Sequence, residues 1–195
     1  MKKLLTLAAV AAAVMSCGNK TAQKTCCEDS ADVAYVDTVA ENHPEYLPEI
    51  AVDTIAPDFC ARDTAGTEIR LSDYKGKYVV LDFWASWCGD CRAEVPELKK
   101  VFNEFKDTKI NGSDVQFLSY SFDREEQAWK DFLKKEAFEW PQVSTLEPKW
   151  HDNVAAKGYG LHWIPAFILV SPEGKVAGKA ISAKGLRQLM KDEMK

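Results

Sequence analysis

Two cysteines separated by two residues stand in the run Trp87-Cys88-Gly89-Asp90-Cys91. Such a pair has four explanations: a redox-active dithiol, half of a zinc site, a copper site, or coincidence. A structural zinc ion takes four ligands, usually from a second cysteine pair or from paired histidines. No such set is spaced for zinc here, because the histidines are scattered and the other paired cysteines lie far upstream (His43, His151, His162, Cys26 and Cys27). The pair therefore favours disulfide exchange, and we predict no metal site.

An apolar stretch precedes the pair and a helical pattern follows it. Residues 78–84 are apolar on both faces apart from Asp82, which is typical of a buried central strand. From 92 to 105 apolar residues recur at helical spacing, and Pro96 is expected to kink this helix near its start. The pair is thus placed between the end of a strand and the mouth of a helix.

This placement predicts different tasks for the two sulfurs. The amide groups and the dipole of a helix N-terminus stabilise a thiolate, so we expect Cys88 to attack a substrate disulfide. Cys91, about one turn later and more buried, is expected to resolve the mixed disulfide. Gly89 leaves the backbone without a side chain where a substrate would dock.

The rest of the domain alternates between strand and helix patterns. A small hairpin is expected over 58–71, with its turn at Asp63 and Gly66. Further strands are predicted at 115–122, 166–170 and 175–180, and helices at 125–136, 153–159 and 184–195. This order indicates an α/β fold with a mixed sheet.

The N-terminal residues predict export. A basic start at Met1-Lys2-Lys3 and an apolar run over 4–14 are typical of a secretory signal, and the run is too short to span a bilayer. Val14-Met15-Ser16-Cys17 resembles the lipobox of bacterial lipoproteins, in which the cysteine is lipidated. We therefore expect a protein of the cell envelope that faces the periplasm and is tethered only through lipidated Cys17. The alternative is an ordinary signal peptide in which Cys17 is incidental.

Composition divides the chain into three parts. We expect a lipoprotein signal peptide over 1–16, a lipidated N-terminus and flexible stalk over 17–50, and one domain over 51–195. Removal of the signal takes Lys2 and Lys3 away and changes the net charge from −5 to −7. Such a charge argues against nucleic acid as a partner.

The stretch Val80-Leu81-Asp82-Phe83-Trp84-Ala85-Ser86-Trp87-Cys88-Gly89-Asp90-Cys91 resembles the active-site segment of the thioredoxin superfamily. Residues 92–96 are similar to the membrane-anchored TlpA/ResA branch, whose domain is of the AhpC/TSA–redoxin type, and 56–59 and 71–77 are also typical of it. The resemblance covers roughly residues 56 to 190. It implies a thioredoxin-like three-layer fold, in which helices flank a central mixed sheet with an N-terminal β-hairpin extension. It also implies a protein-disulfide oxidoreductase that needs no cofactor.

The resemblance carries three further residues into the site. Asp82 matches a carboxylate beneath the second cysteine that relays a proton, and burial in an apolar strand should raise its pKa. Pro165 matches a cis-proline, which would bring Ile164 beside the pair and leave its backbone free to bind an extended substrate. Glu94 matches an acidic residue implicated in acid–base behaviour. The structural alternatives are a buried Asp82 held by backbone bonds, a trans Pro165, and an exposed Glu94 paired with lysine.

Asp90 departs from the family pattern, because thioredoxins and many relatives have proline there. A carboxylate roughly 6 Å from the Cys88 sulfur would cost its thiolate on the order of 1 kcal/mol. We therefore predict that Asp90 makes the couple more reducing, unless its side chain is fully solvated. Trp87 is expected to meet substrate, and Trp84 to pack beside the pair.

Two competing functions are considered. A thiol peroxidase would need a proline and a threonine or serine at fixed distances before its cysteine, but Val80-Leu81 and Ala85 stand there. A copper-delivery protein of the Sco type normally has three residues between its cysteines and would need His162 as third ligand. The favoured function is reduction of disulfides in exported proteins. Its expected partners are protein disulfides or dithiols and a membrane electron donor or acceptor, and a monomer is expected.

Overall fold

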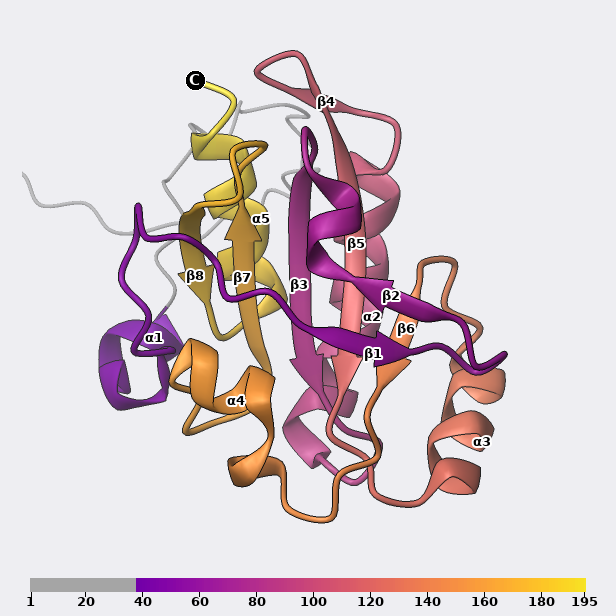
Figure 1. Ribbon diagram of the computed structural model, residues 1–195. Helices are drawn as coiled ribbons and strands as arrows, with labels where there is room; N and C mark the ends of the chain where they lie inside the picture. The colour runs from indigo at the N-terminus through magenta and orange to yellow at the C-terminus, as the bar shows by residue number, and fades with distance from the viewer. Residues whose placement is uncertain (1–37) are drawn as a thin grey trace, which may run out of the picture. The chain divides into compact units, whose positions relative to one another are not determined.

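The computed structural model describes residues 38–195, in which strands and helices alternate along the chain (Figure 1). Within these residues the strands are β1 (Cys60–Arg62), β2 (Glu68–Arg70), β3 (Tyr78–Trp84), β4 (Lys109–Ile110), β5 (Ser113–Ser121), β6 (Gln142–Ser144), β7 (Ala166–Val170) and β8 (Val176–Ala180). The α-helices are α1 (Thr38–Asn42), α2 (Gly89–Phe105), α3 (Glu126–Glu136), α4 (Val154–Tyr159) and α5 (Ala183–Asp192). Three short 3₁₀ helices are η1 (Pro44–Tyr46), η2 (Leu71–Tyr74) and η3 (Trp150–Asp152).

The sheet is mixed, as the sequence predicted, and its order is β2-β1-β6-β5-β3-β7-β8, with β4 paired to β5. The central strand β3 runs parallel to β5 and antiparallel to β7. All of its residues are buried, which agrees with its apolar sequence. The redox pair therefore follows a strand whose residues are all buried.

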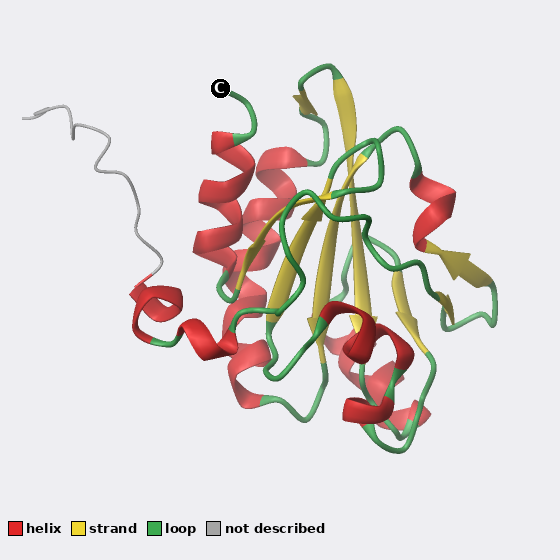
Figure 2. Cartoon of the chain, turned by 60° about the vertical axis from the view of Figure 1, so that its left-hand side comes forward, coloured by secondary structure: helices red, strands yellow, loops and turns green. Residues whose placement is uncertain are grey.

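The two faces of the sheet carry separate cores, because successive side chains of a strand point to opposite sides. Val80 and Phe117 pack with residues of α2 and α5, whereas Leu81 and Leu118 pack on the other side with residues of α4. Figure 2 shows the helices on the two sides of the sheet. By the same alternation, Asp82 of β3 shares the face of Val80, beneath α2.

The predicted hairpin is present and joins the sheet. β1 and β2 pair antiparallel, and Arg62 of β1 pairs with Ser144 of β6. The Asp63 carboxylate accepts from the backbone N–H groups of Ala65 and Thr67, and this closes the turn. The extension therefore adds two short strands to one edge of the sheet.

Helix α2 differs from its prediction at its start, whereas the kink at Pro96 stays a prediction. It begins at Gly89 rather than at residue 92, and it continues without interruption through Pro96 to Phe105. Buried contacts of Val95 and Leu98, on both sides of Pro96, hold the helix against the sheet.

The predicted boundary of the domain at residue 51 lies too far along the chain. The N–H groups of Glu49 and Ile50 donate to the carbonyl oxygens of Gly160 and Tyr159 at 3.0 and 3.3 Å, and Pro48 is buried. Residues 46–50 are thus packed on the domain and are not part of a flexible stalk. Too few apolar residues stand there to form a periodic pattern, so the sequence could not show this contact.

Several predictions fall on residues 1–37, outside the described part of the chain. They are the signal peptide, lipidated Cys17 and the stalk that carries Cys26 and Cys27. Within residues 38–195, no helix has both the length and the apolar character needed to cross a bilayer.

Candidate active site

Cys88 and Cys91 form a disulfide at the start of α2, with their Cα atoms 5.3 Å apart. Cys88 is the N-cap residue of the helix, and the Cys91 N–H donates to its Sγ at 3.1 Å. The two residues are only 7% and 4% exposed, respectively. An N–H group and a helix N-terminus directed at Sγ favour negative charge on Cys88 once the disulfide is reduced.

The surroundings of Cys88 leave one side open. The carbonyl oxygen of Ile164 lies 3.5 Å from Cys88 Sγ, and the Ile164–Pro165 peptide bond is cis, as the resemblance implied. Trp87 is 52% exposed beside the pair. Among the described atoms, none lies within 4 Å of a Cβ placed on Gly89. A substrate therefore has access along Trp87, Gly89 and the backbone at Ile164.

Asp82 is buried on the same face of the sheet as α2. Burial raises the pKa of its carboxyl to about 7, a hydrogen bond from Ser119 opposes the rise, and the Glu94 carboxylate adds to it. The Ser119 hydroxyl donates to Asp82 Oδ2 at 2.7 Å and accepts from Trp140 Nε1 at 2.8 Å. A carboxyl that titrates near neutrality can both accept and return a proton under ordinary conditions.

Ser119 and Trp140 were missed in the sequence. Asp82 and Ser119 are direct partners in the parallel pairing of β3 with β5. A serine inside an apolar strand is a weak signal by itself. The pairing register, which decides that Ser119 faces Asp82, is a tertiary property.

The Glu94 side chain is not exposed to solvent like that of a surface glutamate, but reaches the start of α5. Its Oε2 accepts the backbone N–H of Ala183 at 2.7 Å, at the beginning of α5. The side chain is half-buried and close enough to Asp82 to act on its pKa. Its catalytic role stays a prediction, as does that of Asp90, which is exposed.

A second buried carboxylate holds the turn before the pair. Asp123 accepts from the N–H of Ser86 at 2.9 Å and from its hydroxyl at 2.6 Å. The Ser121 hydroxyl donates to the same carboxylate at 2.6 Å. Sequence reasoning missed Asp123 because it stands 37 residues after Ser86 in the chain.

The remaining chemical side chains lie apart from the pair. Within residues 38–195 no group of three histidine, cysteine or acidic residues could hold a metal ion, and His162 is paired with Glu49 at 2.8 Å. Cys60 is free and half-buried. Cys60 is not one of the predicted site residues.

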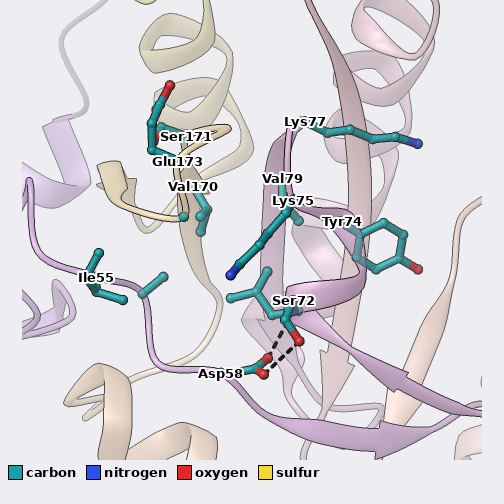
Figure 3. A pocket seen from close by; sticks show the side chains of 13 residues that line it. Ile55, Asp58, Ser72, Tyr74, Lys75, Lys77, Val79, Val170, Ser171 and Glu173 are labelled. Atoms are coloured by element: carbon teal, nitrogen blue, oxygen red, sulfur yellow. Dashed lines mark hydrogen bonds between the residues drawn. The ribbon is translucent and has the colours of Figure 1, made fainter.

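A cavity of about 230 Å³ lies at the other end of β3, away from the redox pair. Figure 3 shows Asp58 bonded to Ser72 on one side of it. Its lining includes residues from the loops before β1 and β3 and from the paired ends of β3 and β7 (Ile55, Asp58, Leu71, Lys75, Val79 and Val170). Because it contains none of the predicted site residues, we assign the active site to the start of α2.

Residues 52–179, most of the chain, match the family model described as the AhpC/TSA family. The chain belongs to this family. The matched range contains the redox pair, Asp82 and Pro165, and it extends from the segment before β1 into β8.

The chain is similar to several thiol-disulfide oxidoreductases. The chain is 32% identical to the thiol-disulfide oxidoreductase ResA of Bacillus subtilis over 139 residues, which is 71% of this chain and 72% of that protein. It is also similar to the thioredoxin domain of a thiol-disulfide oxidoreductase from Bacteroides vulgatus, with 32% identity, a TM-score of 0.66, and coverage of 75% of this chain and 100% of the other. A thiol:disulfide interchange protein from a Bacteroides species gives 34% identity and a TM-score of 0.63, over 73% and 90% of the two chains.

The predicted thioredoxin-like fold, its ResA-like branch and its enzymatic class are thereby confirmed. The protein is a dithiol thiol–disulfide oxidoreductase, and its Cys88 and Cys91 lie at disulfide distance. The peroxidase and copper-delivery alternatives are not favoured by the relatives or by the geometry.

Proposed function

We propose that this AhpC/TSA family protein reduces disulfide bonds in exported proteins. The observation that carries the proposal is a cysteine pair at a helix start, together with a buried carboxyl in the preceding strand whose pKa is raised to about 7. The helix start supplies a stabilised nucleophile, and the carboxyl supplies a base for the second, buried thiol.

The reaction proceeds in two exchange steps. The Cys88 thiolate attacks one sulfur of the substrate disulfide, forms a mixed disulfide and releases the other sulfur as a thiolate. Asp82 accepts the proton of Cys91, and the Cys91 thiolate attacks Cys88 Sγ. The second substrate thiolate leaves, and the protein is left with its own disulfide. The substrate gains two electrons, and the protein loses two.

The neighbouring residues take supporting roles in this scheme. Trp87, Gly89 and the backbone at Ile164 and Pro165 contact the substrate around Cys88. Glu94 raises the proton affinity of Asp82 through its charge. Asp90, in the first turn of α2, disfavours the Cys88 thiolate and so makes the protein a better reductant.

The cellular setting rests on the N-terminal sequence. A signal peptide over 1–16 and a lipidated Cys17 would place the domain in the periplasm as a tethered monomer. An exported reductase is not supplied by cytosolic reductants, so a membrane electron donor would reduce Cys88–Cys91 again.

Turbidity that follows reduction of insulin tests the activity, with dithiothreitol as electron source. The Cys88→Ser variant should be inactive, and the matched control Cys60→Ser should keep full activity. The Cys91→Ser variant should accumulate a mixed disulfide between Cys88 and the substrate, which mass spectrometry identifies. Full insulin reduction by Cys88→Ser would contradict the proposal, and so would a Cys91→Ser variant that retains no substrate.

A further inference from the structure

A groove of about 300 Å³ lies beside the redox pair, between the first turns of α2 and the connection from β8 to α5. Aromatic and aliphatic side chains line most of it, and two carboxylates stand on the α2 side (Tyr46, Asp90, Glu94, Trp163, Pro165 and Ile181). It is continuous with the active site, because Pro165 follows Ile164, whose carbonyl oxygen lies 3.5 Å from Cys88 Sγ.

The wall formed by Tyr46 comes from the segment before the family domain, over residues 43–50. The Tyr46 ring stacks on Trp163 at 4.3 Å between centroids with 12° between planes. The His43 ring stacks on Tyr46 in turn at 4.8 Å and 11°. Two rings from this segment thus extend the aromatic surface that begins at Trp163.

The segment is fixed at several points. Lys179 Nζ donates to the carbonyl oxygens of Pro48 and Ile50 at 2.5 and 2.9 Å, and burial lowers the pKa of this lysine. Glu49 bonds to Gly160 through its N–H and to His162 through its carboxylate. The backbone that follows Tyr46 is therefore bound to the domain, and this holds the Tyr46 ring beside the groove.

The charges of the groove are of one sign. Among the described lining residues the charged ones are Asp90 and Glu94, and none is basic. Glu94 is engaged with the N–H of Ala183, whereas the Asp90 carboxylate is exposed. An acidic side chain placed here would be repelled, and a basic or neutral one would not.

We propose that residues 43–50 form a specificity wall of the active site. The groove binds the residue next to the attacked cysteine of the substrate, and it selects an aromatic or aliphatic residue with a basic neighbour over an acidic one. This inference rests on the proposed disulfide exchange and names the substrate segment that the exchange prefers.

The test uses the full chain and short peptides whose single cysteine is joined to thionitrobenzoate. Attack by Cys88 on the peptide sulfur releases the coloured thiolate. Wild-type protein should react with a phenylalanine-flanked peptide at least about five-fold faster than with a serine-flanked one, because the groove buries the ring. The Tyr46→Ala variant should reduce this preference below about two-fold, because the groove then lacks the ring that stacks on Trp163.

Tyr74→Ala is the matched control, since Tyr74 is a half-buried tyrosine at the opposite cavity. It should keep the phenylalanine preference. An unchanged preference in Tyr46→Ala would overturn the proposed wall, and so would a wild-type protein without any preference. An equal loss of all reactions in Tyr46→Ala would assign Tyr46 to the fold and also overturn the wall.

A separate variant, Asp90→Asn, tests the charge preference. Wild-type protein should favour a lysine-flanked over a glutamate-flanked peptide at low salt, and Asp90→Asn should abolish that difference. A charge preference that persists in Asp90→Asn would contradict the electrostatic part of the proposal.

Peptides with serine in place of cysteine test binding to the groove without disulfide exchange. Tryptophan fluorescence measures this binding, even if the protein fails to reduce insulin. Groove binding and the redox function are therefore tested apart.

Discussion

At the scale of single residues, burial of the Asp82 carboxyl costs free energy when the group is charged. A carboxyl that is buried in an apolar strand loses the hydration of its charged form, and the hydrogen bond from the Ser119 hydroxyl compensates part of this loss. The resulting pKa of about 7 lies well above the value of 3.8 expected for an aspartate in water. In the proposed mechanism this carboxyl is the proton acceptor for Cys91.

The Asp82→Asn variant should show this cost in the stability of the oxidised protein. Because the folded pKa is raised, Asp82 binds its proton more tightly in the folded state, so stability is full below about pH 4 and falls as the pH rises towards 7. At pH 8 the variant should exceed the wild type by up to roughly 4 kcal/mol, with little gain at pH 4. Urea unfolding at both pH values measures this, and an equal gain at both would contradict the buried charge.

Ser119→Ala should shift the pH dependence of the resolving step. Loss of the hydroxyl removes the hydrogen bond that lowers the Asp82 pKa, and this pKa should therefore rise above 7. The resolving step should then reach its full rate only at a higher pH, because Asp82 must be deprotonated to accept the proton of Cys91. Stopped-flow reaction with Ellman's reagent separates the attack by Cys88 from the later release caused by Cys91. Trp140→Phe should shift the second phase in the same direction but less. A shift to lower pH in Ser119→Ala would refute this role.

At the scale of elements, the site depends on two connections of the sheet. The end of β3 leads into α2 through a turn at residues 85–88, and the end of β5 leads to Asp123, which binds that turn. The sequence placed the pair between a strand and a helix without difficulty, because the apolar run and the helical spacing are local. It could not place Asp123, because the pairing of β3 with β5 is formed by distant segments.

Asp123→Ala should therefore affect stability and turnover together. The variant leaves the Ser86 N–H and the hydroxyls of Ser86 and Ser121 without their acceptor, a loss of roughly 2–4 kcal/mol in the free energy of unfolding. Insulin reduction should fall as the turn before Cys88 loosens. Asp58→Ala, which removes a carboxylate bonded to Ser72 at the far end of β3, is the control for activity. Normal stability and turnover in Asp123→Ala would show that the turn needs no such anchor.

At the scale of the whole molecule, the described domain continues upstream of the family match, through the segment 43–50 beside the active site. Its exported and tethered setting is a proposal from residues 1–17. A lipid anchor would hold the proposed reductase at the membrane surface, where it would meet a membrane electron donor at a higher effective concentration than in solution.

Cys17→Ser tests the tether in cells. The variant should leave the membrane fraction and appear in the soluble fraction, because acyl chains contribute about 0.8 kcal/mol per buried CH₂ and the substitution removes their attachment site. Insulin reduction by the purified variant should be unchanged. Cys26→Ser, which removes a nearby cysteine outside the lipobox, should stay with the membrane. A Cys17→Ser protein that remains membrane-bound would contradict lipid anchoring.

The sequence by itself determined the features that depend on neighbouring residues. These are the redox pair, the apolar strand that carries Asp82, the order of strands and helices, and the proline that precedes β7. The tertiary structure decided which distant side chains meet them. The register of β3 with β5 brings Ser119 to Asp82, and the return of the N-terminal segment brings Tyr46 to Trp163. Local propensity acts along the chain, whereas proton affinity and substrate contact depend on groups brought together across it.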